Sequence, residues 1–363
     1  MLSNRVIITM IDKMKRSLIF ATTVALLFGC GEHKPEQIDS KEISEADSNS
    51  DKFQDLNLQA RQLFGVLPEV AENAENSITE EKVELGKALY FDKRLSKDNT
   101  QSCNTCHNLN TYGVDNKSFS EGNNGGLGGR NSPTTLNAAL HIAQFWDGRE
   151  PDVESQAGGP ILNPVEMEMS SEQAVVDRLS KIEEYVSLFS NAFPGESTPI
   201  SYENLKNAIG AFERKLITPS KFDEYIKGND DALNEEEKTG LQTFINSGCI
   251  ACHSGNLLGG NMYQKFGLFG NYWEHTKSEK IDEGKYEVTK NESDKYVFKV
   301  PSLRNIEKTA PYFHDGSVEG LNKAIRIMAK TQVNKELTDQ EINEITTFLK
   351  TLTGEVPEEL IKN

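Results

Sequence analysis

The sequence predicts a mostly α-helical protein of two domains, and three observations support this prediction. The pattern Cys-x-x-Cys-His occurs twice, at 103–107 and again at 249–253, so the chain carries two similar sites. Apolar residues recur at helical spacing over much of the chain, whereas no sustained apolar–polar alternation predicts a large sheet. A length of 363 residues is also sufficient for two compact domains.

Residues 1–29 predict an export signal that is not part of the fold. Basic residues between 13 and 16 precede the apolar run 17–28, and small residues then precede Cys30. This pattern resembles a bacterial lipoprotein signal in which Cys30 becomes the lipidated first residue, with Met14 as a fitting start. An ordinary signal peptide with an incidental cysteine is the alternative. A membrane span is disfavoured, because the apolar run is shorter than the ~20 residues that cross a bilayer.

Residues 30–55 are polar and acidic, with almost no large apolar side chains. Such a segment cannot bury enough surface to offset the entropy lost on ordering, so it predicts a flexible acidic tether. The whole chain has a formal net charge of -17. Nucleic-acid binding needs a basic surface and is excluded, while a basic protein partner fits this charge, as does a role in solubility alone.

Folded structure is expected from about Leu56. The segment 79–82, Thr-Glu-Glu-Lys, predicts a capped helix start that leads into an apolar face before the first cysteine motif. Between 122 and 129, five glycines and two asparagines predict a loop whose backbone approaches a bulky neighbour. Further helices are expected at 173–179, 182–192, 202–216 and 235–246.

Each cysteine motif predicts a covalently bound haem c, and hence two haems per chain. The two thiols of a motif add to the haem vinyl groups, and the adjacent imidazole reaches the iron as its proximal ligand. The predicted haem-binding residues are Cys103, Cys106, His107, Cys249, Cys252 and His253. One structural zinc site made of the four cysteines is the alternative, but it gives neither histidine a reason to follow its cysteine.

Four segments resemble the bacterial di-haem cytochrome c peroxidase family. They are SCNTCHN at 102–108, AQFWDGR at 143–149, NPVEM at 163–167 and APYFH at 310–314. The resemblance extends from about Leu56 to near Glu358 and implies two c-type-cytochrome-like helical haem domains packed against each other. The N-terminal peroxidatic haem domain is expected at 56–216 and the C-terminal electron-transfer haem domain at 217–363.

The resemblance implies an enzyme that reduces hydrogen peroxide with electrons from a small periplasmic protein, a cytochrome c or a cupredoxin. This chemistry needs an iron with a free face and a group that carries a proton between the two peroxide oxygens. The family places its matching glutamate, here Glu166, in that role, with Gln156 orienting peroxide and Trp146 between the haems. From the residues alone, Glu166 also fits a solvated carboxylate in a first helical turn, and Trp146 fits a core anchor.

A thioether opposite His253 would raise the potential of the second haem. Met262 is nine residues past His253, which is cramped for reaching the opposite face of the haem. Met328 stands where the family has its ligand methionine and is the preferred candidate, although a core methionine on an amphipathic helix is the alternative. Relatives that oxidise other proteins have a tyrosine at this place, so Met328 favours the peroxidase branch.

The resemblance also implies a calcium ion held by oxygen ligands from Asn131, Thr309 and Pro311. His314 matches a family residue, and its role is left open. Many relatives carry a histidine in the loop after the first haem motif, which caps the peroxidatic iron until the other haem is reduced. This chain has no histidine between His107 and Asn131, and Asn123 occupies the matching place. The first haem is therefore expected to be open without reductive activation.

Two rival functions fit part of the sequence: a di-haem electron carrier without peroxide chemistry, and an oxidase that modifies a partner protein. Glu166 beside an open iron disfavours the carrier, and Met328 disfavours the oxidase. The expected partners are hydrogen peroxide and the small donor protein. We expect a periplasm-facing protein that meets the membrane through its lipid anchor only, and the sequence is compatible with a monomer or a homodimer.

Overall fold

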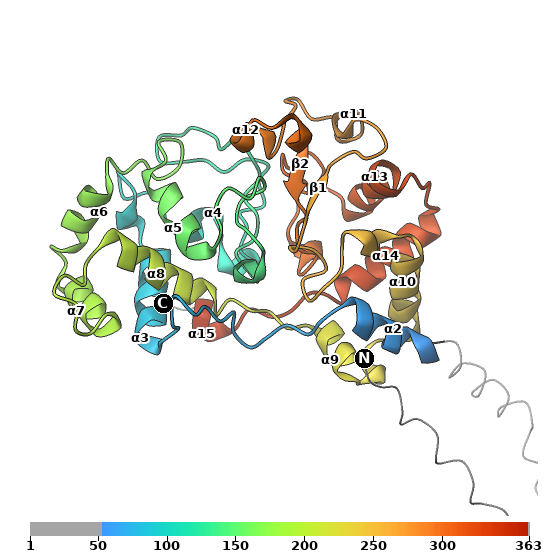
Figure 1. Ribbon diagram of the computed structural model, residues 1–363, viewed down its shortest axis with the longest axis horizontal. Coiled ribbons are helices and arrows are strands. Elements are labelled where there is room, and N and C mark those ends of the chain that lie inside the picture. The colour runs from blue at the N-terminus through green and yellow to red at the C-terminus, as the bar shows by residue number, and fades with distance from the viewer. Residues whose placement is uncertain (1–52, 362–363) are drawn as a thin grey trace, which may run out of the picture. The chain divides into compact units, whose positions relative to one another are not determined.

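The computed structural model describes residues 53–361, so the predicted signal, Cys30 and most of the predicted tether lie outside the described residues. The described chain is mostly helical, and its one sheet has two short antiparallel strands. Figure 1 shows this arrangement. The expected mostly α-helical fold class is confirmed. Between 53 and 361, no helix is both long and apolar enough to cross a membrane.

In chain order, the α-helices are α2 (Gln54–Leu63), α3 (Glu80–Phe91), α4 (Cys103–Cys106), α5 (Val153–Leu162), α6 (Glu172–Leu179), α7 (Glu183–Ala192), α8 (Tyr202–Glu213), α9 (Lys221–Lys227), α10 (Glu235–Asn246), α11 (Tyr272–Thr276), α12 (Tyr286–Thr289), α13 (Leu321–Val333), α14 (Asp339–Lys350) and α15 (Glu358–Ile361). The strands are β1 (Tyr263–Lys265) and β2 (Val297–Lys299).

Each cysteine motif follows a helix that packs closely against a second helix, with a glycine at the point of contact. Before the first motif, α3 packs on α8, where a Cβ added at Gly86 would lie 1.9 Å from the Ala208 carbonyl oxygen. Before the second motif, α10 packs on α14, where a Cβ at Gly240 would lie 2.1 Å from the Glu344 carbonyl oxygen. Protein interiors are close-packed and leave no spare room, so a side chain at Gly86 or Gly240 would force the two helices apart.

The two ends of the described chain pack against elements distant in sequence. Leu56 of α2 belongs to a buried apolar cluster with Phe222 of α9 and Phe348 of α14, and Figure 1 shows α2 beside these helices. Leu360 of α15 packs with Val83 of α3. The proposed division at residues 216 and 217 stays a prediction, and the packing adds that each terminal helix joins the core of the opposite half.

A buried ion pair fixes the segment that follows β2. The guanidinium of Arg304 donates to both carboxylate oxygens of Asp223 on α9, at 2.5 and 3.0 Å, and neither side chain is exposed. Burial alone would raise the pKa of Asp223, but the charge and hydrogen bonds of Arg304 outweigh it and lower that pKa. The pair holds the chain around residue 304 in place, and residues 298–303 line the cavity beside the second motif that is described below.

Candidate active site

The first Cys-x-x-Cys-His motif is held by a capped helical turn. Ser102 and Thr105 form a reciprocal capping box at the start of α4, so the two cysteines lie on one turn. The Nδ1 atom of His107 lies 2.9 Å from the Pro133 carbonyl oxygen, and the Tyr90 hydroxyl donates to the His107 carbonyl oxygen at 2.7 Å. The imidazole is thereby oriented by its Nδ1 atom, which leaves Nε2 to face an iron.

The second motif follows α10 and orients its histidine in the same way, although its turn is of another type and has no side-chain cap. Its first three residues form a 3₁₀ turn, Cys249–Ala251. The Nδ1 atom of His253 lies 2.9 Å from the Leu258 carbonyl oxygen, which again leaves Nε2 for a metal. Burial lowers the pKa of both His107 and His253, which favours the neutral imidazole that binds metals.

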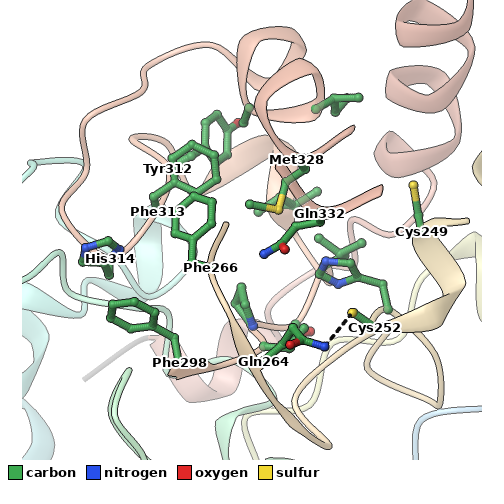
Figure 2. Close-up of a pocket in the computed structure, with 18 of the residues that line it drawn as sticks. Cys249, Cys252, Gln264, Phe266, Phe298, Tyr312, Phe313, His314, Met328 and Gln332 are labelled. Atoms are coloured by element: carbon green, nitrogen blue, oxygen red, sulfur yellow. Dashed lines mark hydrogen bonds between the residues drawn. The ribbon is translucent and has the colours of Figure 1, made fainter. Parts of the chain in front are cut away.

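A cavity of about 340 Å³ opens beside the second motif. Figure 2 shows Met328 and Gln332 on one side of it, Cys249 and Cys252 on another, and aromatic side chains across from them. The lining is mainly apolar and includes Phe266, Phe298, Tyr312, Phe313, Leu321 and Ile325. A large apolar pocket with a few convergent polar groups is typical of a cofactor site.

These features fit covalently bound haem at both motifs. All four motif cysteines are free thiols on short turns, and each neighbouring histidine offers an unengaged Nε2 atom. The four-cysteine zinc alternative does not fit. Within residues 53–361, no three Cys, His, Asp or Glu side chains lie close enough together to hold one metal ion.

Glu166 is partly buried close to the first motif. Burial raises the pKa of the Cys103 and Cys106 thiols. Nearby charges raise them further: Glu213 acts most on Cys103 and Asp115 most on Cys106, and the smaller contribution of Glu166 reaches both. Burial also raises the pKa of Glu166 itself, against the opposing charge of Arg149 and a 2.8 Å hydrogen bond from Asn163 to its Oε1 atom. A carboxyl group whose pKa is raised in this way is suited to exchanging protons.

The glycine-rich loop supports the turn that carries Glu166. A Cβ added at Gly122 would lie 1.9 Å from the Val165 carbonyl oxygen, so the loop lies directly on this turn. The backbone N–H of Asn123 donates to the Glu166 carbonyl oxygen at 2.7 Å. The bulky neighbour expected for this loop is therefore the backbone of residues 165 and 166. Gln156 lies on α5, and no hydrogen bond in the described part of the chain joins its side chain to Glu166.

The side chain of Asn123 is fully engaged in a polar network. Its Oδ1 atom accepts from the Asp98 backbone N–H at 3.1 Å and from the Thr100 hydroxyl at 3.0 Å. Its Nδ2 atom donates to carboxylate oxygens of Asp98 and Glu168, at 2.9 and 3.2 Å. The amide is thus held by its neighbours and has no remaining strong ligand atom to offer a metal.

Trp146 and the three calcium candidates line the cavity of the second motif together. The indole N–H of Trp146 donates to the Asn131 carbonyl oxygen at 2.9 Å, and Thr309 and Pro311 lie along the same cavity. His314 is buried among aromatic rings, with its ring centre 6.3 Å from that of Trp146. The side-chain amide of Asn131 donates to the Lys117 carbonyl oxygen at 2.8 Å.

Met328 and Met262 differ in their relation to this cavity. Met328 lies on α13 and lines the cavity together with His253, whereas Met262 is not among its lining residues. The backbone of Met262 accepts a hydrogen bond from Val300 at 3.0 Å next to the two-stranded sheet. The placement favours Met328 as the axial ligand candidate, which stays a prediction.

Two neighbours of the candidate site were not expected from the sequence. Arg149 acts electrostatically on Glu166, while its guanidinium stacks 3.4 Å from the Phe145 ring centre and pairs with Asp147. Asn163 bonds Glu166 three residues further along the chain. Asn163 and Glu166 are three residues apart in one short turn, and this spacing could have indicated their contact. Arg149 is distant from Glu166 in the sequence, so no local pattern indicates that the two interact.

Known proteins resemble this chain over most of its length. Residues 80–231 match the di-haem cytochrome c peroxidase family model, and residues 238–353 match the cytochrome c model. The cytochrome c551 peroxidase of Pseudomonas aeruginosa is 47% identical over 83% of this chain and 87% of its own length. That of Nitrosomonas europaea is 45% identical over 76% of this chain and 80% of its own.

A solved structure gives the same result for the fold. The crystal structure of a MauG-like protein associated with microbial copper homeostasis superimposes with a TM-score of 0.71 at 29% identity, over 83% of this chain and 96% of that one. The resemblance expected from the sequence is confirmed, as is the expected pair of cytochrome-like domains. The chain belongs to the di-haem cytochrome c peroxidase family.

Proposed function

We propose that this protein reduces hydrogen peroxide to two molecules of water, using two protons and two electrons delivered by a small donor protein. Close relatives named as cytochrome c peroxidases support this activity. The observation that carries it is the partly buried carboxyl group of Glu166, within electrostatic reach of both first-motif cysteines. A di-haem electron carrier would have no use for such a group.

Two haems, when bound, supply the iron at which the O–O bond is broken and the centre that stores an incoming electron. Around the first motif, His107 is oriented by Pro133, and Glu166 is fixed by Asn163 through its Oε1 atom. The Oε2 atom of Glu166 is then the atom that takes a proton from one peroxide oxygen and returns it to the other. Gln156 orients the peroxide.

Cys249, Cys252 and His253 would hold the haem that takes electrons from the donor, and Met328, which lines the same cavity, would supply a thioether ligand to it. A thioether ligand favours the ferrous state and makes this haem a good electron acceptor. Trp146 lines this cavity and donates its indole N–H to the Asn131 carbonyl oxygen, and we assign it to the electron path between the haems. Trp146 can pack in the cavity wall and lie on the electron path at the same time.

The setting of the enzyme is also part of the proposal. The donor is a cytochrome c or a cupredoxin, and the protein faces the periplasm, anchored through a lipid on Cys30. A calcium ion is held by oxygen atoms of Asn131, Thr309 and Pro311, because calcium prefers such ligands and all three residues lie along one cavity. A homodimer is compatible with this setting.

The first haem would have a free coordination position in the fully oxidised enzyme, because Asn123 stands where many relatives have a capping histidine and its amide is engaged elsewhere. Oxidised protein should show a high-spin optical signal and react with peroxide at once in stopped-flow measurements. Asn123→His should convert this haem to a low-spin form that reacts only after half-reduction. Asn123→Ala is the matched control, since it loses the same hydrogen bonds without adding an imidazole.

Low-spin spectra for both haems of the oxidised wild type, with a lag that half-reduction removes, would contradict the open site. An electron carrier would give a third outcome, in which peroxide changes neither the oxidised nor the half-reduced spectrum. That result would reject the peroxidase itself.

A further inference from the structure

Lys299 and His141 form a buried basic pair in the wall of the large cavity. Lys299 is the last residue of β2 and is only 6% exposed, and its Nζ atom lies 2.8 Å from the Nδ1 atom of His141. The backbone N–H of Lys299 donates to the Trp146 carbonyl oxygen at 2.8 Å. Both side chains line the same cavity as Cys252 and His253 of the second motif.

The hydrogen bonds of this pair leave several donors without an acceptor. An ammonium group has no acceptor atom, so Lys299 donates and the Nδ1 atom of His141 accepts. The proton of the neutral imidazole is then on Nε2, which is buried and has no partner among the described residues. No acceptor in residues 53–361 engages the two other N–H bonds of Lys299. Three donors of one small cluster are therefore unsatisfied.

The charge of Lys299 also lacks a partner in the cavity. None of the lining residues is Asp or Glu. Burial lowers the pKa of Lys299 to about 8, and burial, followed by the charge of Lys299, holds the pKa of His141 well below its usual value. A buried cation is costly unless an anion pairs with it, and buried polar groups are otherwise hydrogen-bonded. The site is complementary to an anion with two acceptor oxygens.

We propose that Lys299 and His141 bind a propionate carboxylate of the haem attached to Cys249 and Cys252. The inference rests on the second haem of the proposed function. A carboxylate supplies two oxygens for the unsatisfied donors and a negative charge for the ammonium group. It is also already present in the cavity, because the haem is covalently tethered there. The backbone bond from Lys299 to Trp146 would connect this carboxylate site to the aromatic group assigned to the electron path.

Removal of the ammonium group should lower the potential of the second haem. An uncompensated carboxylate beside the haem stabilises its more positive, oxidised state. In Lys299→Met, the reduction equilibrium of this haem should shift about tenfold or more towards the oxidised form, which is 59 mV for a one-electron couple. Lys299→Arg should keep the wild-type potential. Lys265→Met is the matched control, since it removes one lysine charge from the neighbouring strand β1, outside the cavity lining.

The holoenzymes would be titrated by spectroelectrochemistry, with the two haem additions checked by intact mass. Redox-difference infrared spectra would follow the carboxylate stretch, which should shift in Lys299→Met and in the milder variant His141→Phe, but not in Lys265→Met. Unchanged potentials and unchanged carboxylate bands in both cavity variants would overturn the proposal. The His141 variant retains the buried charge and keeps the test valid if Lys299→Met does not fold.

The source of the carboxylate is distinguished by a buffer series. A propionate site predicts a wild-type potential that does not change when chloride is replaced by acetate or formate at constant ionic strength. A potential that follows the acetate concentration would place a solution anion at Lys299 and overturn the propionate assignment. A protein with one haem by mass would instead reject the proposed function, while a two-haem protein without peroxide turnover would leave this test of Lys299 intact.

Discussion

Glu166→Gln should lower peroxide turnover about 10²–10⁴-fold, the range that a general acid–base group typically supplies. An amide is nearly the same shape as the carboxyl group but cannot take a proton from one oxygen and return it to the other. Both haems should stay bound and reducible. The measurement is steady-state peroxide reduction with a reduced donor, together with intact mass and a dithionite-reduced spectrum.

Glu168→Gln is the matched control for this substitution. Glu168 lies on the same turn, but its carboxylate binds Lys97 at 2.7 Å and the amide of Asn123. Its loss should leave turnover close to that of the wild type. If Glu166→Gln retained most of its turnover, the proton shuttle would have to be reassigned, with Gln156 or an ordered water as the next candidate.

The pH profile offers a second measurement on the same residue. Glu166 must be ionised to take the proton from peroxide, and burial raises its pKa above that of an ordinary glutamate. Wild-type turnover should therefore fall as the pH decreases through this raised pKa. The acid limb should disappear in Glu166→Gln, whose residual activity no longer depends on that ionisation.

Met328→Ala should lower the midpoint potential of the second haem by roughly 0.1 V or more, because axial ligands set haem potentials over a span of ≈ 0.8 V. Loss of the thioether removes a ligand that favours the ferrous state. The first haem should change little, and turnover should fall because electrons enter less readily. A spectroelectrochemical titration resolves the two centres.

Met262→Ala separates the two candidate ligands. Met262 does not line the cavity, so its truncation should leave both potentials unchanged. A shift in Met262→Ala with an unmoved centre in Met328→Ala would make Met262 the ligand. Unmoved potentials in both variants would exclude a thioether ligand.

Local sequence signals predicted the helices well where capping and packing agree. Thr79 caps α3 as expected, with its hydroxyl accepting from the Lys82 backbone N–H, and the helix expected at 235–246 is α10, Glu235–Asn246. The helix expected at 202–216 ends earlier, at Glu213. The backbone N–H of Arg214 makes the last helical hydrogen bond, to Gly210, and those of Lys215 and Leu216 then bond only three residues back, in tighter turns. Apolar periodicity continues through such a turn and does not report where helical hydrogen bonding stops.

Contacts between distant segments could not be predicted in the same way. His141 and Lys299 are 158 positions apart, and neither lies in a pattern that indicates the other. The packing of Leu56 with Phe348 is equally non-local. Local propensity carries no information on such pairs, which depend on how the two halves of the chain close around their cavities. For the glycine-rich loop, the sequence predicted that the backbone approaches a bulky neighbour, but it did not predict that this neighbour is Val165.

The residues of the candidate site also differ in how far local sequence patterns could identify them. The two cysteine motifs are contiguous, so the sequence alone placed their thiols and imidazoles together. Glu166 and Met328 were assigned through family resemblance, because one acid or one methionine in a helical chain has no chemical signature. The structure adds the groups that act on them: Asn163 and Arg149 at Glu166, and the cavity wall around Met328.

A single-turnover titration tests the central claim most directly. The fully reduced protein holds two electrons, one at each haem, which is the number that one peroxide molecule consumes. We expect one equivalent of hydrogen peroxide to oxidise both haems within the mixing experiment, and Glu166→Gln to do so at least about 100-fold more slowly. Slow oxidation with no dependence on Glu166, or a stoichiometry other than one peroxide for two haems, would contradict the account.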